Sequence, residues 1–165
     1  MEDLDRDGLA TAKRVRIEIV GRPPKDFGLG PVDIRAAAAW FAARSRARIG
    51  NPVWHEVTVH FIGDAASDEI HRAVIGVAGV TDVVTQAYDA IPPEPPGLYG
   101  EIFVNTDQAL RAAPKRRGWG LAKELLLYVA HGMDHLSGAD DHTERGYRAM
   151  RRRELEWIRE WCRRI

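Results

Sequence analysis

Apolar and polar residues alternate along several short segments of the chain, which is the pattern of β-strands that bury one face. Four segments show this alternation or a matching enrichment in β-branched residues: 14–22, 56–64, 81–89 and 100–106. In the first of them, Val15, Ile17 and Ile19 alternate with charged neighbours. Residues 91–100 contain four prolines, which remove amide donors, so an exposed loop is predicted between the last two strands.

Five other segments have the spacing or composition of helices: 32–50, 67–76, 107–113, 119–136 and 143–163. Asp33 and Ser67 are expected to cap the first two helices at their N-termini. Gly138 stands where a glycine commonly follows the end of a helix. The apolar side chains expected to face the core are Leu121, Leu125, Val129 and Leu136 on the fourth helix, and Trp157 and Trp161 on the last.

Strands and helices are mixed along the chain, no internal repeat is present, and the two long helices come last. This order predicts the α+β class, as a single domain with a mixed four-stranded sheet, one antiparallel edge strand, and helices packed on it. The polar residues 1–14 are expected to be disordered, which leaves 15–165 as the domain.

The chain has 165 residues, enough for one domain with a substantial core. Cys162 is the only cysteine, so an internal disulfide is excluded, as is typical of a reducing compartment. We find no secretory signal and no run of about 18 apolar residues. A cytoplasmic protein is therefore expected, with no membrane association and no dinucleotide cofactor.

The net charge of the chain is zero, but acidic and basic side chains are distributed unevenly along it. Residues 1–110 carry 11 basic and 16 acidic side chains, or −5, whereas residues 111–165 carry 13 basic and 8 acidic, or +5. Such basic excess attracts polyanions such as RNA, although arginines on a solvated helix face often pair with nearby glutamates instead. The basic side chains form two clusters, Arg111, Lys115, Arg116 and Arg117, and then Arg145, Arg148, Arg151, Arg152 and Arg153.

Residues 130–142 (AHGMDHLSGADDH) have a spacing that points to a metal ion. His131 and His135 are four residues apart on the predicted helix, so both imidazoles lie on the same face. Gly138 then ends the helix, and 139–142 turn back with two aspartates and a histidine. Two helical histidines and a third ligand from the following turn resemble metzincin geometry and leave one coordination position open. The alternative is two ordinary histidines, on the surface or hydrogen-bonded in the core.

The residue after the first histidine distinguishes this segment from zinc proteases, whose HExxH motif places a glutamate there as general base. Here that position is Gly132. A glycine inside a helix costs roughly 1 kcal/mol relative to alanine, so it implies close packing or room for a substrate. Proteolysis by the standard route is therefore not expected.

The histidine segment resembles the signature of the YbeY family, H-G-x-x-H-L-x-G-x-D, at residues 131–140. Residues 81–85 (TDVVT) and 100–104 (GEIFV) resemble two strands of that family. Glu124 falls on the family's helix glutamate, and residues 150–154 (MRRRE) resemble its M-x-x-x-E tail. These features follow one another in the family's order.

The resemblance implies a zinc-dependent endoribonuclease that cleaves single-stranded RNA in ribosomal RNA maturation and ribosome quality control. The implied cofactor is one zinc ion, which would activate water and polarise a phosphoryl oxygen. The implied partners are ribosomal RNA and proteins of the ribosomal subunit. Two rival hypotheses are a small metallohydrolase that acts on peptides, and a non-catalytic ribosome- or RNA-associated protein with a structural metal.

The family usually carries a third histidine ten positions after the first, where this chain has Asp141. The expected ligands are therefore His131, His135 and Asp141, because an aspartate oxygen is a sound zinc ligand. His142 is the alternative third ligand, since a turn can absorb one residue. Asp140 is expected to be a turn residue or to orient a ligand imidazole.

Two further positions depart from the family. Asp134 stands where the family typically has leucine, and we expect it to be a solvated helix residue; the alternative is a carboxylate near the metal. The family's functional arginine aligns with Ile75, so Arg72, one turn earlier, is a candidate catalytic replacement, and its alternative is a plain surface arginine. No general base is identified. The residues expected to contact the RNA backbone come from the first basic cluster: Lys115, Arg116 and Arg117.

Overall fold

The computed structural model describes residues 15–49, 54–95 and 97–165. The expectation of a disordered segment at 1–14 lies outside these residues, as does the predicted end of the first helix at Gly50. Within the described part of the chain, no helix is both long and apolar enough to cross a membrane.

Four strands form one mixed sheet, β1 (Arg16–Val20), β2 (Trp54–Ile62), β3 (Val83–Asp89) and β4 (Leu98–Asn105), in the order β1-β2-β4-β3. β1 pairs with β2 and β2 with β4 in parallel, whereas β3 pairs with β4 antiparallel at the edge. The predicted strands and the single antiparallel edge strand are therefore confirmed.

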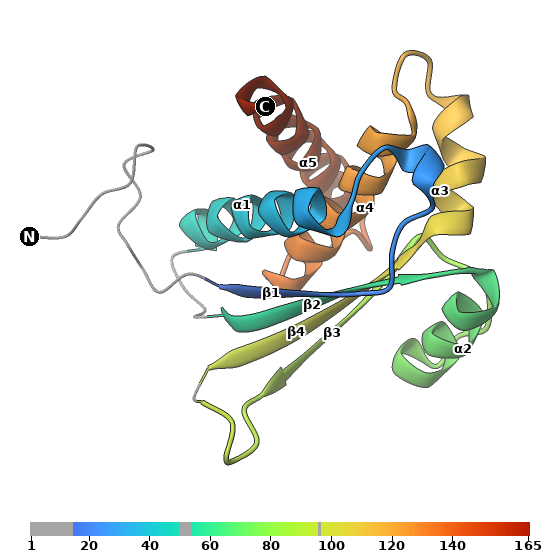
Figure 1. The fold of residues 1–165 in the computed structure, drawn as a ribbon. Coiled ribbons are helices and arrows are strands. Elements are labelled where there is room, and N and C mark those ends of the chain that lie inside the picture. Colours follow the sequence, from blue (N-terminus) through green and yellow to red (C-terminus); the bar gives the residue numbers. More distant parts are fainter. Residues whose placement is uncertain (1–14, 50–53, 96) are drawn as a thin grey trace, which may run out of the picture.

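Helices α1 and α4 cover one face of the sheet, α5 packs on these two helices, and α2 lies on the opposite side of the sheet (Figure 1). Short 3-10 turns, η1 and η2, precede α1 and follow α3. The α+β class is confirmed. The helices and turns have the bounds η1 Lys25–Phe27, α1 Pro31–Ile49, α2 Asp64–Ile75, α3 Thr106–Ala112, η2 Ala113–Lys115, α4 Leu121–Leu136 and α5 Glu144–Arg164.

The core lies between the sheet and helices α1 and α4, and α5 adds side chains to it from the far side of these helices. Val57 and Val59 of β2 and Ile102 of β4 are fully buried there, against Leu125 and Val129 of α4. Burial of such side chains contributes roughly 1.5–3 kcal/mol each. The other predicted core side chains of α4, Leu121 and Leu136, are partly buried against this core.

The last helix is held down by aromatic packing, as predicted. Trp157 stacks on Phe41 of α1 with ring centroids 6.3 Å apart, and Trp161 packs against Trp40 at 6.0 Å. Both tryptophans of α5 therefore belong to the interface between helices and not to a surface for base stacking.

The predicted cap at Asp33 is wrong. α1 begins at Pro31, whose fixed φ suits the first helical position, so Asp33 lies inside the first turn. Its carboxylate reaches back and accepts the N–H of Gly30 at 2.8 Å. This contact is one of the two hydrogen bonds of a capping box. Asp33 therefore does mark the start of a helix, but the helix begins two residues before it and not after it.

The predicted cap at Ser67 is also wrong, because α2 begins three residues earlier, at Asp64. Ser67 is buried inside the helix, and its hydroxyl donates to the carbonyl of Thr81 at 3.1 Å. The prediction for Gly138 is confirmed, since this residue follows α4 with φ of +90°, a conformation that favours glycine.

Asp64 connects α2 to α3 through a bidentate ion pair with Arg111, with N–O distances of 2.6 and 2.7 Å. The hydrogen bond from Arg111, and then that from Asn105, lowers the pKa of Asp64 from 3.8 to about 2. A carboxyl group whose pKa is lower in the folded than in the unfolded protein stabilises the fold at any pH above its ordinary pKa. This stabilisation is lost as the pH falls through the lowered pKa.

We expect Asp64→Asn to lower the free energy of unfolding at pH 7. The difference from the wild type should stay constant down to about pH 4 and then shrink toward pH 2. Urea unfolding at a series of pH values measures it, with Glu69→Gln on the same helix as the control for charge removal. A difference that is the same at pH 7 and pH 2 would show that the ion pair does not stabilise the fold.

Candidate metal centre

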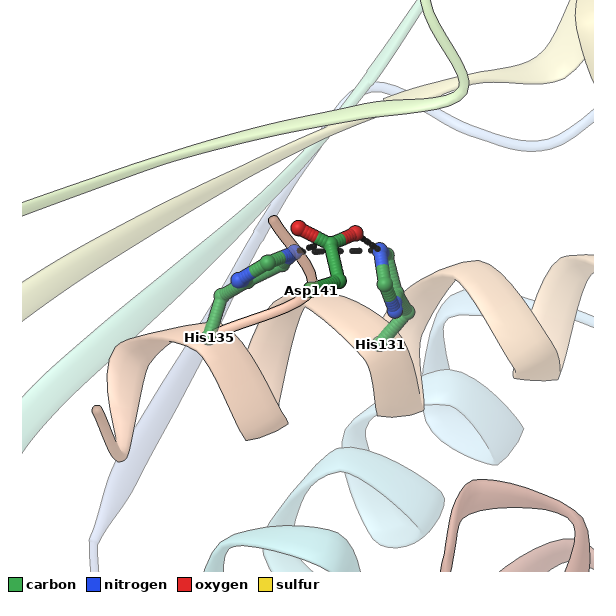
Figure 2. Close-up of side chains that lie close together, drawn as sticks. All are labelled: His131, His135 and Asp141. Atoms are coloured by element: carbon green, nitrogen blue, oxygen red, sulfur yellow. Dashed lines mark hydrogen bonds and ion pairs between the residues drawn. The ribbon is translucent and has the colours of Figure 1, made fainter. Parts of the chain in front are cut away.

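The last two turns of α4 and the turn after it bring three potential metal ligands together (Figure 2). The Nε2 atoms of His131 and His135 are 3.1 Å apart. Asp141, from the turn, places Oδ2 at 3.6 Å from each of these nitrogens. The i, i+4 spacing on α4 and the reversal after Gly138 thus produce the predicted juxtaposition.

The other ring nitrogen of each histidine is already committed. Nδ1 of His135 lies 3.1 Å from the carbonyl oxygen of Ala139, which can only accept, so this nitrogen carries a hydrogen. Nδ1 of His131 lies 2.5 Å from a carboxylate oxygen of Glu154. With both Nδ1 atoms donating, the two Nε2 atoms present lone pairs to one another at 3.1 Å. Such lone pairs repel unless a cation or a proton lies between them.

The spacing of the donor atoms fits a small divalent cation. Zinc–ligand bonds of ~2.0–2.1 Å in a tetrahedron separate the ligand atoms by roughly 3.3–3.4 Å. The observed separations of 3.1, 3.6 and 3.6 Å bracket this value. Two imidazole nitrogens and one carboxylate oxygen are also a ligand set that suits zinc, with a fourth position left for water or substrate.

His142 is not joined to the two imidazoles. Its side chain is 89% exposed and lies 3.6 Å from Asp140. Among the described residues it forms a second, exposed group with Asp140 and Asp141. Asp140 accepts the backbone N–H of His142 at 2.8 Å, which gives it the turn role, and it makes no contact with the imidazole of His131 or His135 among the described residues.

Glu154 of α5 orients His131, a role that the sequence did not reveal because the two residues are 23 positions apart. The carboxylate is fully buried. Burial by itself lowers the pKa of His131, but the hydrogen bond and the charge of Glu154 outweigh it and raise this pKa above its ordinary value. A carboxylate behind a ligand imidazole fixes the ring and increases its basicity, as is common in metal sites.

The expectation of a solvated Asp134 is wrong. Its side chain is fully buried, and Arg153 of α5 binds both carboxylate oxygens, with N–O distances from 2.8 to 3.1 Å. A buried carboxylate requires such a partner, and here it comes from the residue next to Glu154. The pair therefore ties α5 to α4 beside the histidines.

Gly132 is explained by close packing. A Cβ atom at this position would lie 2.5 Å from Cγ2 of Ile102 on β4. One turn later, Leu136 of α4 approaches Gly100 of β4 so closely that a Cβ on the glycine would lie 2.8 Å away. The helix thus rests directly on β4, and no space exists for the glutamate of a zinc protease.

The candidate arginine on α2 is not drawn into this cluster. Arg72 pairs with Asp68 one turn away, at 3.2 Å, and the pair is largely exposed. Ile75, where the family has its arginine, is 54% exposed at the end of the same helix. α2 lies across the sheet from α4 (Figure 1).

The first basic cluster is partly used inside the fold. Nε of Arg116 lies 3.0 Å from the carboxylate of Glu124, which is fully buried on α4. Burial, and then the charge of Glu124, raises the pKa of the neighbouring Tyr128. Lys115 and Arg117 are exposed. Of the three predicted RNA contacts, therefore, Arg116 has an internal partner.

Comparisons with known proteins identify relatives of this chain. A sequence model of the family described as Endoribonuclease YbeY matches residues 33–161. Proteins named Endoribonuclease YbeY include relatives from Thermus thermophilus, Moorella thermoacetica and Anaeromyxobacter. The Thermus relative is 34% identical over 79% of this chain and 88% of its own length. The Moorella relative is 34% identical over 60% of this chain and 68% of its own length. The Anaeromyxobacter relative is 33% identical over 74% of this chain and 60% of its own length. The solution structure of a Thermotoga maritima protein is similar in fold, with a TM-score of 0.53 and 20% identity over 88% of each chain.

The packing at Gly132 predicts an unusual double-mutant cycle. Gly132→Ala should lower the free energy of unfolding by about 1–3 kcal/mol, because the added methyl group overpacks against Ile102. In an Ile102→Ala background the same change should be neutral, or stabilising by up to ~1 kcal/mol, because alanine is the better helix former. Denaturant unfolding of the four proteins tests this, and an equal loss in both backgrounds would contradict it.

The contact behind His131 predicts a change in metal affinity. Glu154→Gln should weaken zinc binding by roughly 10–100-fold, as for other residues that orient a ligand imidazole. Competition with a chromophoric chelator measures the affinity. Glu156→Gln, an exposed change on the same helix, serves as the control. Unchanged zinc affinity in Glu154→Gln would remove Glu154 from the site.

Proposed function

The chain belongs to the YbeY family of endoribonucleases, and on this premise we propose that it hydrolyses RNA phosphodiester bonds with one zinc ion. His131, His135 and Asp141 would hold the ion. The observation that carries the proposal is the approach of the two Nε2 atoms to 3.1 Å, with a carboxylate oxygen 3.6 Å from both. Three potential acceptors around one point are electrostatically unfavourable unless a cation or a proton lies between them.

A bound zinc ion supplies Lewis acidity, which lowers the pKa of water toward neutrality and polarises a phosphoryl oxygen. The residues of the chain supply the rest. Glu154 and the carbonyl of Ala139 each accept a hydrogen bond from Nδ1 of a histidine, which orients both rings and directs both Nε2 atoms at one point. Asp141 contributes a negative charge to the ligand set.

We further propose that the substrate is single-stranded ribosomal RNA and that the activity serves ribosomal RNA maturation and ribosome quality control. The names of the relatives support the endoribonuclease activity, and the basic C-terminal part of the chain, with a net charge of +5, supports a polyanionic substrate. Proteins of the ribosomal subunit would be the partners, and the cytoplasm the location.

Peptide hydrolysis is the weaker alternative. The zinc-protease route needs a glutamate directly after the first histidine, and the Gly132 backbone lies too close to Ile102 to carry one. A purely structural metal is also disfavoured. Structural zinc sites are normally closed by four protein ligands, whereas the described residues offer three here.

The test compares Asp141→Ala with His142→Ala, a matched change at the next residue. Asp141→Ala should lose zinc affinity by more than the roughly 10–100-fold typical of residues that only orient a ligand, because it removes a ligand atom. It should also lose zinc-dependent cleavage of a single-stranded ribosomal RNA fragment, whereas His142→Ala should retain both. Cleavage that persists in Asp141→Ala and in metal-stripped protein would refute the proposal.

A further inference from the structure

We propose that the outer face of α5 is the track that binds the phosphate backbone of single-stranded RNA. This inference rests on the proposed function and deepens it by assigning the substrate surface. Three exposed arginines define the track, Arg148, Arg152 and Arg159, and they line one hollow together with Tyr147, Arg151 and Leu155. Glu156 is the single acidic residue in this lining.

The track follows from the helical repeat. Positions 148, 152, 155 and 159 recur at intervals of four, three and four residues, so these side chains lie along one stripe of the helix. At 1.5 Å per residue, the stripe is roughly 16 Å long. The opposite stripe of α5, which includes Met150, Trp157 and Ile158, is buried against the rest of the fold. Arg148, Arg152 and Arg159 are therefore presented to solvent by the same packing that fixes the helix.

The charges of the track are available to a ligand. Arg152 and Arg159 are exposed, and neither forms an ion pair or a hydrogen bond within the described part of the chain. Arg148 pairs only with Glu144, and both side chains are more than 70% exposed, so water competes strongly with this contact. A phosphate group could pair with Arg152 and Arg159, and it could displace Glu144 from Arg148.

The first basic cluster, which the sequence alone favoured for RNA, differs in this respect. Arg111 is held by both oxygens of Asp64, and Arg116 lies against the buried Glu124. Both guanidinium groups thus contribute to the packing of α2, α3 and α4. Only Lys115 and Arg117 of this cluster remain free of an ion pair among the described residues.

An exposed aromatic ring stands at the start of the track. Tyr147 is 45% exposed, and the guanidinium carbon of Arg151 lies 5.6 Å from its ring centroid. Proteins that bind single-stranded nucleic acid without sequence choice combine basic side chains with rings on which bases stack. Tyr147 gives the track such a ring.

The helix that carries the track begins near the candidate metal centre. α5 starts three residues after Asp141, which limits the separation of their Cα atoms to about 10 Å. Arg151 lies 4.0 Å from Glu154, whose carboxylate binds His131. RNA bound along α5 would therefore approach the metal ligands at the N-terminal end of the helix.

Binding of a fluorescent 12-nucleotide single-stranded RNA by metal-stripped protein in EDTA tests the inference without cleavage. Arg152→Ala/Arg159→Ala should weaken binding by roughly 10–30-fold at 0.1 M salt. The slope of log affinity against log salt should become shallower by about 1.4, since each lost phosphate contact removes ~0.7. The matched control, Lys115→Ala/Arg117→Ala, removes the same charge and should weaken binding less than threefold.

Tyr147→Ala should weaken binding without changing the salt slope, and Tyr147→Phe should bind as the wild type does. All these changes are at exposed side chains, and unchanged melting temperatures would verify the folds. Equal weakening by the two double variants would overturn the track, because it would show attraction by net charge alone. Poly-glutamate that displaces the RNA at equal charge concentration would also overturn it, in favour of an acidic protein partner.

The failures of the two proposals are distinguishable. Wild-type protein that binds RNA through Arg152 and Arg159, but does not cleave it with zinc, would refute the nuclease and leave the track in place. Zinc-dependent cleavage that is unaffected by Arg152→Ala/Arg159→Ala, together with unchanged RNA affinity, would refute the track and leave the nuclease in place.

Discussion

The close contact between α4 and β4 is the constraint on which the site depends. Gly132 and Gly100 omit the side chains that would separate the helix from the strand, and Ile102 and Leu136 fill the space instead. The helix therefore rests on the middle of the sheet in one rotational setting. That setting turns His131 and His135 toward the returning turn, where Asp141 meets them. A small shift of the helix would separate donor atoms that must lie within about 0.5 Å of a tetrahedral arrangement.

A second constraint comes from two buried carboxylates on facing helices. Glu154 of α5 requires a donor, which His131 provides, and Asp134 of α4 requires a cation, which Arg153 provides. Burying either carboxylate without its partner would cost several kcal/mol. In one pair the carboxylate is on α5, and in the other it is on α4. Both pairs involve adjacent residues of α5, so together they fix the rotation and the register of this helix against α4. The buried side of α5 thus positions the candidate metal ligands, and its outer side carries the exposed arginines.

Local signals predicted most of the fold. Alternation identified the four strands, the i, i+4 spacing identified the histidine pair, and Gly138 ended α4 as expected. The errors arose where the decisive contact was not local. Asp33 and Ser67 have the chemistry of caps, but Pro31 and the carbonyl of Thr81 determine what they do. Asp134 was expected in solvent because its partner, Arg153, is 19 residues away on another helix, and the role of Glu154 was missed for the same reason.

Contacts between residues far apart in the sequence also decide which of the basic side chains can bind a ligand. The sequence shows a C-terminal part with an excess of five positive charges, but it does not show which arginines are already paired. Arg111, Arg116 and Arg153 neutralise carboxylates of the fold, whereas Arg152 and Arg159 do not. The net charge of the candidate ligand set also bears on how an anionic substrate is attracted. With His131, His135 and Asp141 as ligands, a divalent ion would have a net charge of +1, whereas three histidines would leave +2. A centre with less positive charge attracts a phosphodiester less strongly, so the unpaired arginines of α5 would supply attraction that the ligands of the centre do not.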